Sequence, residues 1–127
     1  SHLSSYVETI PGAARKLIES AEKPTTIIYP EAKNLATNLI APDGSIGIRI
    51  TPDPFCKQLI RYTGKPIVST SANISGRKSP SSYRDIDPEI IEQVDYTVDW
   101  RREEEPGGTP SALVKVDRDG KMTWLRS

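Results

Sequence analysis

The sequence predicts an α/β fold in which a mixed β-sheet is flanked by helices. Stretches with helical spacing of apolar residues interleave irregularly with short stretches rich in β-branched residues. Residues 45–50 alternate between isoleucines and other residues, as a half-buried strand does. Residues 112–116 and 121–126 form a terminal hairpin pattern around an Asp119-Gly120 turn. The 127-residue length suits one domain.

The N-terminal elements follow from local patterns. Residues 12–22 place their apolar side chains on one helical face, and Pro24 follows as a stop. Residues 25–29 are β-branched and predict a strand, whereas residues 31–44 look irregular, with a short helical turn at 36–39. In the strand 45–50, the isoleucines share one face, and Ser45, Gly47 and Arg49 share the other.

The central residues predict a second helix and a second strand region. The helix opens at residues 52–54 and runs to about residue 62, with Phe55, Leu59 and Ile60 facing inward. Gly64 ends it. Residues 67–70 read as a short buried strand.

The following residues are mostly polar. Residues 71–87 predict a long loop, and Asp87 is placed to cap a helix over residues 88–93. Residues 96–98 are a candidate strand, and residues 101–109 predict a charged, exposed loop. We expect Trp100 and Trp124 to be packing residues.

Composition narrows the class of protein. Lys plus Arg and Asp plus Glu are 17 each, which argues against general nucleic-acid binding. Cys56 is the single cysteine, so no internal disulfide is possible, and the single histidine leaves no Ser-His-Asp or Cys/His metal arrangement.

No run of about 18 apolar residues and no signal peptide appear, so we expect a cytoplasmic protein with no membrane partner. Ser1 and His2 read as a cloning remnant.

Residues 65–76 contain the strongest candidate site. An apolar pair is followed by hydroxyls, an amide and Gly76, which offer hydrogen-bond donors to an anion. The candidate residues are Ser69, Ser71, Asn73 and Ser79. The alternative is a loop that only satisfies its own backbone.

Two arginines extend this hypothesis. Arg49 shares a strand face with Ser45, and its planar fork suits a carboxylate or phosphate, although a surface ion pair is the alternative. The hairpin would carry Ser111 and Arg126 to the same end of the sheet, whereas a lone terminal arginine is otherwise a frayed surface residue.

These residues and their order resemble a known family. From about Tyr6 to Arg126 the chain is similar to the YrdC-like threonylcarbamoyl-adenylate synthases. The blocks that carry the resemblance are residues 23–28, residues 45–50, the run Lys65-Pro66-Ile67-Val68-Ser69-Thr70-Ser71-Ala72-Asn73-Ile74-Ser75-Gly76, Pro80, residues 110–114 and the closing Leu125-Arg126. The resemblance implies a twisted mixed sheet with a large, positively charged cleft.

The resemblance also implies a reaction and its site. The family joins L-threonine, bicarbonate and ATP, with Mg²⁺, into threonylcarbamoyl-AMP and pyrophosphate, for the threonylcarbamoyl modification of adenosine in tRNA. By position, the ATP contacts would be Ser45, Ser71, Asn73, Ser79 and Arg126, and the threonine contacts Arg49, Ser69 and Ser111. By the same resemblance, we expect no side chain to act as a nucleophile and no residue to bind a metal. Other tRNA threonylcarbamoylation proteins would be partners.

The chain departs from the family at its start. The family's opening Pro-Thr and Lys-x-Arg blocks do not occur, so we expect residues 1–127 to be the C-terminal portion of one YrdC-like domain, with little or no activity alone. Ala112 and Thr51 stand where the family more often has Thr and Pro.

Two alternatives stay open. One is a module that binds tRNA or double-stranded RNA without catalysis through the loop cations Arg77, Lys78, Arg84, Arg101 and Arg102. The other is a carbamoyl-transfer relative such as a hydrogenase-maturation protein, whose zinc-finger cysteines are not found here.

Overall fold

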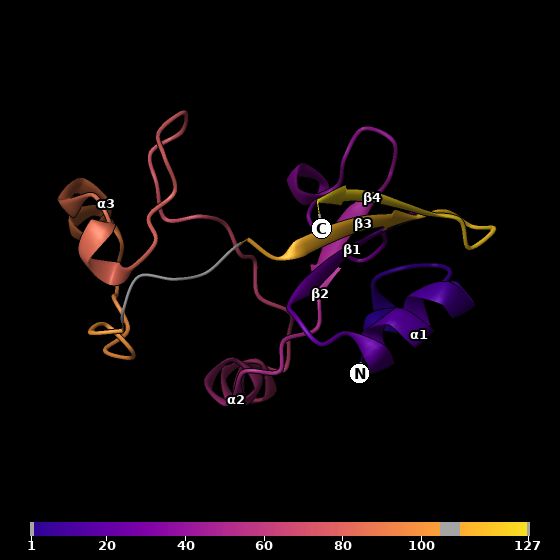
Figure 1. Cartoon of the computed structure of the whole chain (residues 1–127), viewed down its shortest axis with the longest axis horizontal. Helices are drawn as coiled ribbons and strands as arrows, with labels where there is room; N and C mark the ends of the chain where they lie inside the picture. The colour runs from indigo at the N-terminus through magenta and orange to yellow at the C-terminus, as the bar shows by residue number, and fades with distance from the viewer. Residues whose placement is uncertain (1, 105–109, 127) are drawn as a thin grey trace. The chain divides into compact units, whose positions relative to one another are not determined.

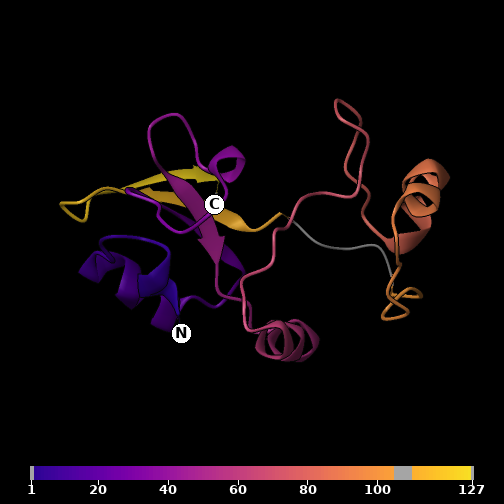
Figure 2. The same cartoon turned by 180° about the vertical axis from the view of Figure 1, so that it is seen from behind.

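The computed structural model describes residues 2–104 and 110–126, and the chain divides into two compact units. The first unit contains residues 1–59 and 110–127, and the second contains residues 60–109. Figures 1 and 2 show the chain from opposite sides. None of the described helices is long and apolar enough to cross a membrane.

The first unit is built on a four-stranded mixed sheet. Its strands are β1 (Thr25–Tyr29), β2 (Ile46–Arg49), β3 (Ala112–Val116) and β4 (Met122–Arg126), in the order β2-β1-β3-β4. β1 pairs antiparallel with β2 and parallel with β3, and β3 pairs antiparallel with β4. The predicted α/β class with a mixed sheet is therefore confirmed.

One face of this sheet carries the core. Alternate residues of β1 and β3 point to it, because side chains along a strand alternate between faces. The helix α1 (Gly12–Ser20) contributes Ala14 to this core, with Leu17 and Ile18 packed against it. Figure 1 shows α1 beside the sheet. The buried cluster consists of Leu3, Val7, Ala14, Ile27, Tyr29, Val114 and Val116.

The helix α1 ends at Ser20, two residues before the predicted end. A residue that precedes proline is disfavoured in helical conformation, so Lys23-Pro24 forces the chain into an extended path before β1. Ala21 already has extended backbone angles.

The other face of the sheet lies away from this core. The burial of β2 alternates, with Ile46 and Ile48 packed against the core and Gly47 and Arg49 exposed. This alternation confirms the faces predicted for residues 46–49, whereas Ser45 is buried and Ile50, outside the strand, is 43% exposed. The 3-10 helix η2 (Thr37–Leu39) confirms the helical turn expected before the Pro42-Asp43-Gly44 turn.

The helix α2 (Pro54–Thr63) spans the boundary between the two units. Gly64 follows the last residue of this helix, and its φ of +70° fits the predicted stop. None of the helix residues is fully buried. Phe55 and Ile60 are half-buried, which agrees with the prediction that they face inward, whereas Leu59 is 39% exposed and departs from it.

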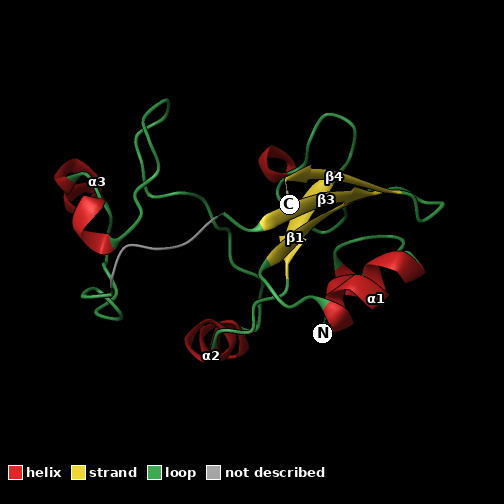
Figure 3. Cartoon of the chain, in the orientation of Figure 1, coloured by secondary structure: helices red, strands yellow, loops and turns green. Residues whose placement is uncertain are grey.

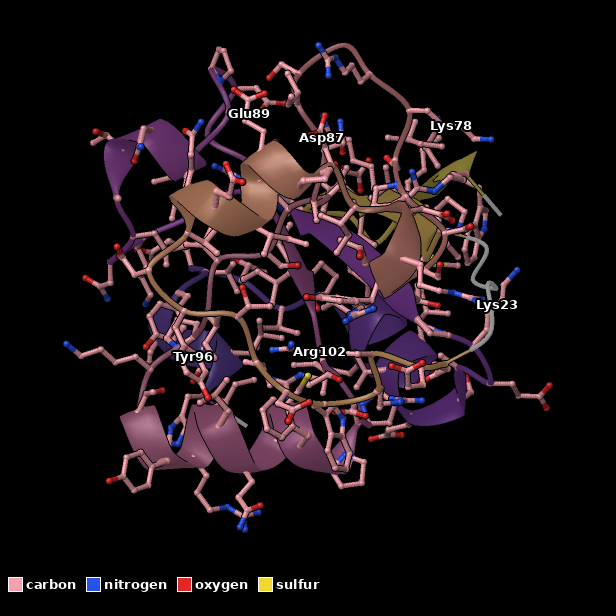
Figure 4. The ribbon with its side chains drawn as sticks, turned by 90° about the vertical axis from the view of Figure 1, so that its left-hand side faces the viewer. Lys23, Lys78, Asp87, Glu89, Tyr96 and Arg102 are labelled. Atoms are coloured by element: carbon pink, nitrogen blue, oxygen red, sulfur yellow. The ribbon has the colours of Figure 1, made fainter. Side chains whose placement is uncertain are left out.

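The second unit is mostly loop, as the green trace in Figure 3 shows. It contains the 3-10 helix η3 (Tyr83–Asp85) and the helix α3 (Pro88–Gln93). Asp87 caps α3 as predicted, because its carboxylate accepts a hydrogen bond of 3.0 Å from the Glu89 backbone N–H. Figure 4 labels Asp87 and Glu89 at the start of this helix.

Two predicted strands are wrong. Residues 67–70 and 96–98 have no strand pairing among the described residues, and Val68 is 67% and Tyr96 78% exposed. β-branched and aromatic residues favour a strand only where a neighbouring strand takes up their backbone hydrogen bonds. Both segments therefore stay extended or irregular.

Two other expectations have mixed outcomes. Trp100 and Trp124 are 53% and 48% exposed, so neither is a buried packing residue. Of the loop predicted at 101–109, residues 101–104 form turns, and residues 105–109 lie outside the described residues.

Candidate functional site

A single row of residues crosses all four strands and has an arginine at each end. Arg49 of β2 pairs with Thr26 of β1, Thr26 pairs with Leu113 of β3, and Leu113 pairs with Arg126 of β4. With strands about 4.8 Å apart, the two arginine Cα atoms lie roughly 14 Å from each other. Paired residues share a face, so both arginines belong to the face opposite the core.

The two guanidinium groups converge on Ser111, directly before β3. Arg49 Nη1 donates to Ser111 Oγ at 3.1 Å, and Arg126 Nε donates to the Ser111 carbonyl oxygen at 2.8 Å. This contact requires the β3–β4 hairpin, in which a β-bulge between Leu113 and Val114 shifts the register. The hairpin therefore brings Ser111 and Arg126 to one end of the sheet, as predicted.

This convergence leaves positive charge without a counter-ion. Within residues 2–104 and 110–126, no carboxylate forms an ion pair with Arg49 or Arg126, and both side chains are exposed. Each guanidinium keeps donors that Ser111 does not use, since arginine has five. Two guanidinium groups beside one serine could therefore bind a carboxylate or phosphate through charge-assisted hydrogen bonds.

An open pocket of about 480 Å³ lies on the same unit. Its lining is mainly apolar and includes the η2 segment and the face-sharing residues of β1, β2 and β3. Gly47 belongs to this lining, and a Cβ built there would come within 3.3 Å of Thr26 Cγ2. Besides Gly47, the lining includes Ile28, Leu39, Ile40, Ser45 and Leu113.

The lining contains two polar residues: Ser45, which is nearly fully buried at 5% exposure, and Asn38, which is exposed. The backbone N–H and the hydroxyl of Ser45 both donate to Asp43 Oδ1, at 3.0 and 2.5 Å. Lys115 Nζ lies 2.9 Å from Asp43 Oδ2. The Ser45 hydroxyl and the Lys115 ammonium hold the pKa of Asp43 well below its usual range.

The predicted hydroxyl and amide residues of the loop belong to the second unit. Ser69, Ser71 and Ser79 are exposed, and Asn73 is half-buried. Asn73 Nδ2 donates to the carbonyl oxygens of Ile74 and Arg77, at 3.1 and 3.0 Å. Asn73 therefore shapes the loop that it was predicted to belong to.

The turn in this loop has the geometry that glycine permits. Arg77 N donates to the Ile74 carbonyl at 2.9 Å, and Gly76 has a φ of +85°. A positive φ at the third turn position is typical of a type II turn. The exposed Ser69 and Ser71 side chains lie before this turn, with no described contact between them and the Asn73 amide.

Several of the loop cations have partners within the second unit. Arg77 Nη1 lies 2.9 Å from Asp87 Oδ2. Arg102 donates to the carbonyl oxygens of Thr97 and Val98 and lies 5.0 Å from the centroid of the Tyr83 ring. Arg101 pairs with Glu104. These contacts reduce the charge that the loops could offer to RNA.

Asp43 and Lys115 are not among the site residues predicted from the sequence, although an aspartate two residues before a serine is placed to accept from that serine's backbone N–H. Lys115 is separated from Asp43 by 72 positions, and the pairing of β2 and β3 on either side of β1 brings the two together. Within the described part of the chain, no three His, Cys, Asp or Glu residues gather as a metal site would need.

Comparisons with known proteins identify the family of this chain. The family model Sua5_yciO_yrdC, described as "Telomere recombination", matches residues 1–127. The threonylcarbamoyl-AMP synthase of Pseudoalteromonas translucida (strain TAC 125) is 36% identical over 99 residues, which cover 76% of this chain and 50% of that protein. No solved structure gives a significant match.

A second relative extends the match along the chain. The threonylcarbamoyl-AMP synthase of Idiomarina loihiensis (strain ATCC BAA-735 / DSM 15497 / L2-TR) is 32% identical over 119 residues, covering 90% of this chain and 62% of that protein. The chain thus spans about half to three fifths of the length of these two relatives. Because the family model covers the whole chain, this protein belongs to the Sua5/YciO/YrdC family.

Proposed function

We propose that this chain forms part of a threonylcarbamoyl-AMP synthase. The whole protein would join L-threonine, bicarbonate and ATP into threonylcarbamoyl-AMP and release pyrophosphate. Family membership supports this, as do the names of the relatives. The observation that carries the proposal is the convergence of Arg49 and Arg126 on Ser111 without a paired carboxylate among the described residues.

The proposed roles follow the chemistry of each side chain. Arg49, with Ser69 and Ser111, would bind the carboxylate and hydroxyl of L-threonine, because a guanidinium fork matches a carboxylate. Arg126 would bind the phosphates of ATP. The remaining proposed ATP contacts are Ser45, Ser71, Asn73 and Ser79.

The reaction needs alignment more than an activated protein nucleophile. The threonine amine attacks the carbon of bicarbonate, and loss of water leaves a carbamate. A carbamate oxygen then attacks the α-phosphorus of ATP, and the bond to pyrophosphate breaks. Guanidinium groups held near the phosphates would stabilise the negative charge of this step, and positioning would supply much of the rest.

The wider context is part of the same proposal. We assign Mg²⁺ to the phosphates of ATP, since Mg²⁺ commonly binds through substrate phosphates. The product would be used to modify adenosine in tRNA in the cytoplasm, together with other threonylcarbamoylation proteins. Both structural units would then be portions of one YrdC-like domain.

Titration calorimetry of the chain with L-threonine and with ATP tests the two arginines separately. A charge-assisted hydrogen bond contributes about 1.5–3 kcal/mol, so Arg49→Ala should weaken L-threonine binding by about 10- to 150-fold. Arg126→Ala should weaken ATP binding by a similar factor. Arg61→Ala, an exposed arginine of α2, is the matched control and should change neither affinity.

The results of these titrations distinguish the proposed synthase function from the RNA-binding alternative. If the wild-type chain binds neither ligand, or if the Arg49 and Arg126 variants bind like Arg61→Ala, the assignment is wrong. Salt-sensitive retention of RNA that is lost when Arg77 and Lys78 become alanine would instead favour the RNA-binding module.

A further inference from the structure

The contacts of Ser45 restrict what this residue can bind. Asp43 is ionised at neutral pH, because hydrogen bonding to Ser45 and Lys115 lowers its pKa, and an ionised carboxylate can only accept. The proton of the Ser45 hydroxyl must therefore point to Asp43 Oδ1, 2.5 Å away. The Ser45 backbone N–H donates to the same oxygen. Ser45 keeps only the lone pairs of Oγ for a ligand.

A phosphate group is a poor partner for this arrangement. Phosphate oxygens accept hydrogen bonds, so a phosphate would have to take the Ser45 proton away from Asp43. The Asp43 carboxylate would also repel it at close range. An N–H or O–H donor has neither problem and would find Ser45 Oγ ready to accept.

The position of Ser45 fits a donor on the non-phosphate part of a nucleotide. Ser45 lines the pocket with Ile28, Leu39, Ile40 and Leu113, whereas Asp43 and Lys115 are not among the lining residues. Apart from Ser45 and the exposed Asn38, the lining is apolar, and apolar walls with a few placed polar groups are typical of sites for small organic ligands. Arg49 lies four residues further along β2, roughly 13 Å away at about 3.3 Å per residue. The phosphates would then lie towards the arginine end.

We propose that Asp43, anchored by Lys115, is a positioning residue that makes Ser45 Oγ an acceptor for an N–H or O–H group of the base or ribose of a bound nucleotide. This inference rests on the proposed function, because it takes the nucleotide to bind on this face of the sheet. It narrows the expected contact between Ser45 and ATP to the base or ribose, with the Ser45 hydroxyl oxygen as the acceptor.

The test compares nucleotides that differ by one donor. Calorimetry of the full chain with ATP, ITP, 2′-deoxy-ATP and 3′-deoxy-ATP identifies the donor that binds to Ser45 Oγ. ITP replaces the amino group of the base by a carbonyl, and the two deoxy analogues each lack one ribose hydroxyl. One hydrogen bond contributes about 0.5–1.5 kcal/mol, so the wild type should bind one analogue about 3- to 10-fold more weakly than ATP. Inorganic tripolyphosphate is the probe for the phosphate end.

The variants separate positioning from structural support. Ser45→Ala and Asp43→Ala should lose the preference for ATP over that analogue while tripolyphosphate binding stays unchanged. Asp43→Asn keeps an acceptor oxygen for the Ser45 proton and should preserve most of the preference. Lys115→Gln should weaken the preference partly, because it removes the anchor and leaves the carboxylate.

Three results would count against the inference. Equal affinities of the wild type for ATP and all three analogues overturn it while leaving the proposed function intact. Equal weakening of tripolyphosphate and ATP by Ser45→Ala and Asp43→Ala also overturns it, because Ser45 would then serve the phosphates. Failure of the wild type to bind ATP and tripolyphosphate overturns the proposed function and this inference with it.

Discussion

Tyr29→Phe should stabilise the first unit. Tyr29 is fully buried in the core of the sheet, and its Oη has no hydrogen-bond partner among the described residues. A buried hydroxyl without a partner costs about 1–3 kcal/mol relative to its hydrated state. Phenylalanine keeps the ring and its contacts, and the space left by one oxygen is small. We therefore expect the free energy of unfolding at pH 7 to rise by about 1–2 kcal/mol.

The same substitution should remove a dependence on alkaline pH. Burial raises the pKa of Tyr29 from 10.0 to about 12, partly offset by the positive charge of Arg15. Between these two values the unfolded chain loses the phenol proton and the folded chain keeps it, so stability present below pH 10 is lost as the pH rises towards 12. At pH 11 this loss amounts to about 1.4 kcal/mol, and Tyr29→Phe cannot show it.

Urea denaturation at pH 7, 9 and 11 measures both effects. The difference between Tyr29→Phe and the wild type should grow by about 1 kcal/mol or more between pH 9 and pH 11. Tyr62→Phe is the matched control, since Tyr62 is 91% exposed, and it should leave the stability unchanged. A Tyr29→Phe variant that is less stable than the wild type at pH 7, or a constant difference across pH, would refute the reasoning.

Two further substitutions test the core and a helix cap. Val114→Ala should lower the free energy of unfolding by about 2–3 kcal/mol in urea, because Val114 is fully buried, whereas Val68→Ala, 67% exposed, should change it by less than about 0.5 kcal/mol. Asp87→Ala should destabilise α3 by about 1 kcal/mol and speed hydrogen exchange at the Glu89 amide, since both the cap and the Arg77 ion pair are lost. Asp87→Asn keeps a capping oxygen, so equally fast exchange in both variants would contradict the capping role.

Much of the first unit could be predicted because its signals are local. The strand at residues 25–29 has the predicted bounds, and the alternation in residues 45–50 predicted the correct face for each side chain of β2. The cap of α3 and the stop at Gly64 depend on backbone groups within a few residues. Helix periods, caps and turns are decided over one or two turns of chain, so the amino-acid order specifies them.

The predictions that were wrong concern strand pairing and burial, which local sequence patterns do not determine. Residues 67–70 resemble a strand in composition as closely as residues 25–29 do, yet only the latter find partners on both sides within the described sheet. The pairing of a strand depends on distant segments, which composition does not report. The prediction that Trp100 and Trp124 are packing residues was wrong for the same reason, because the burial of a side chain depends on which distant segments pack around it.

By itself the sequence determined the α/β class, most helix and strand positions, and the residue types that a site for anions would need. The tertiary structure decided the order β2-β1-β3-β4, the meeting of Arg49 and Arg126 at Ser111, and the anchoring of Asp43 by Lys115. These contacts join positions between 15 and 72 residues apart. The Ser111–Arg126 contact lies within the predicted hairpin. The contacts of longer range exist because hydrogen bonds between strands bring distant segments within about 5 Å of each other, which the local patterns along the chain do not encode.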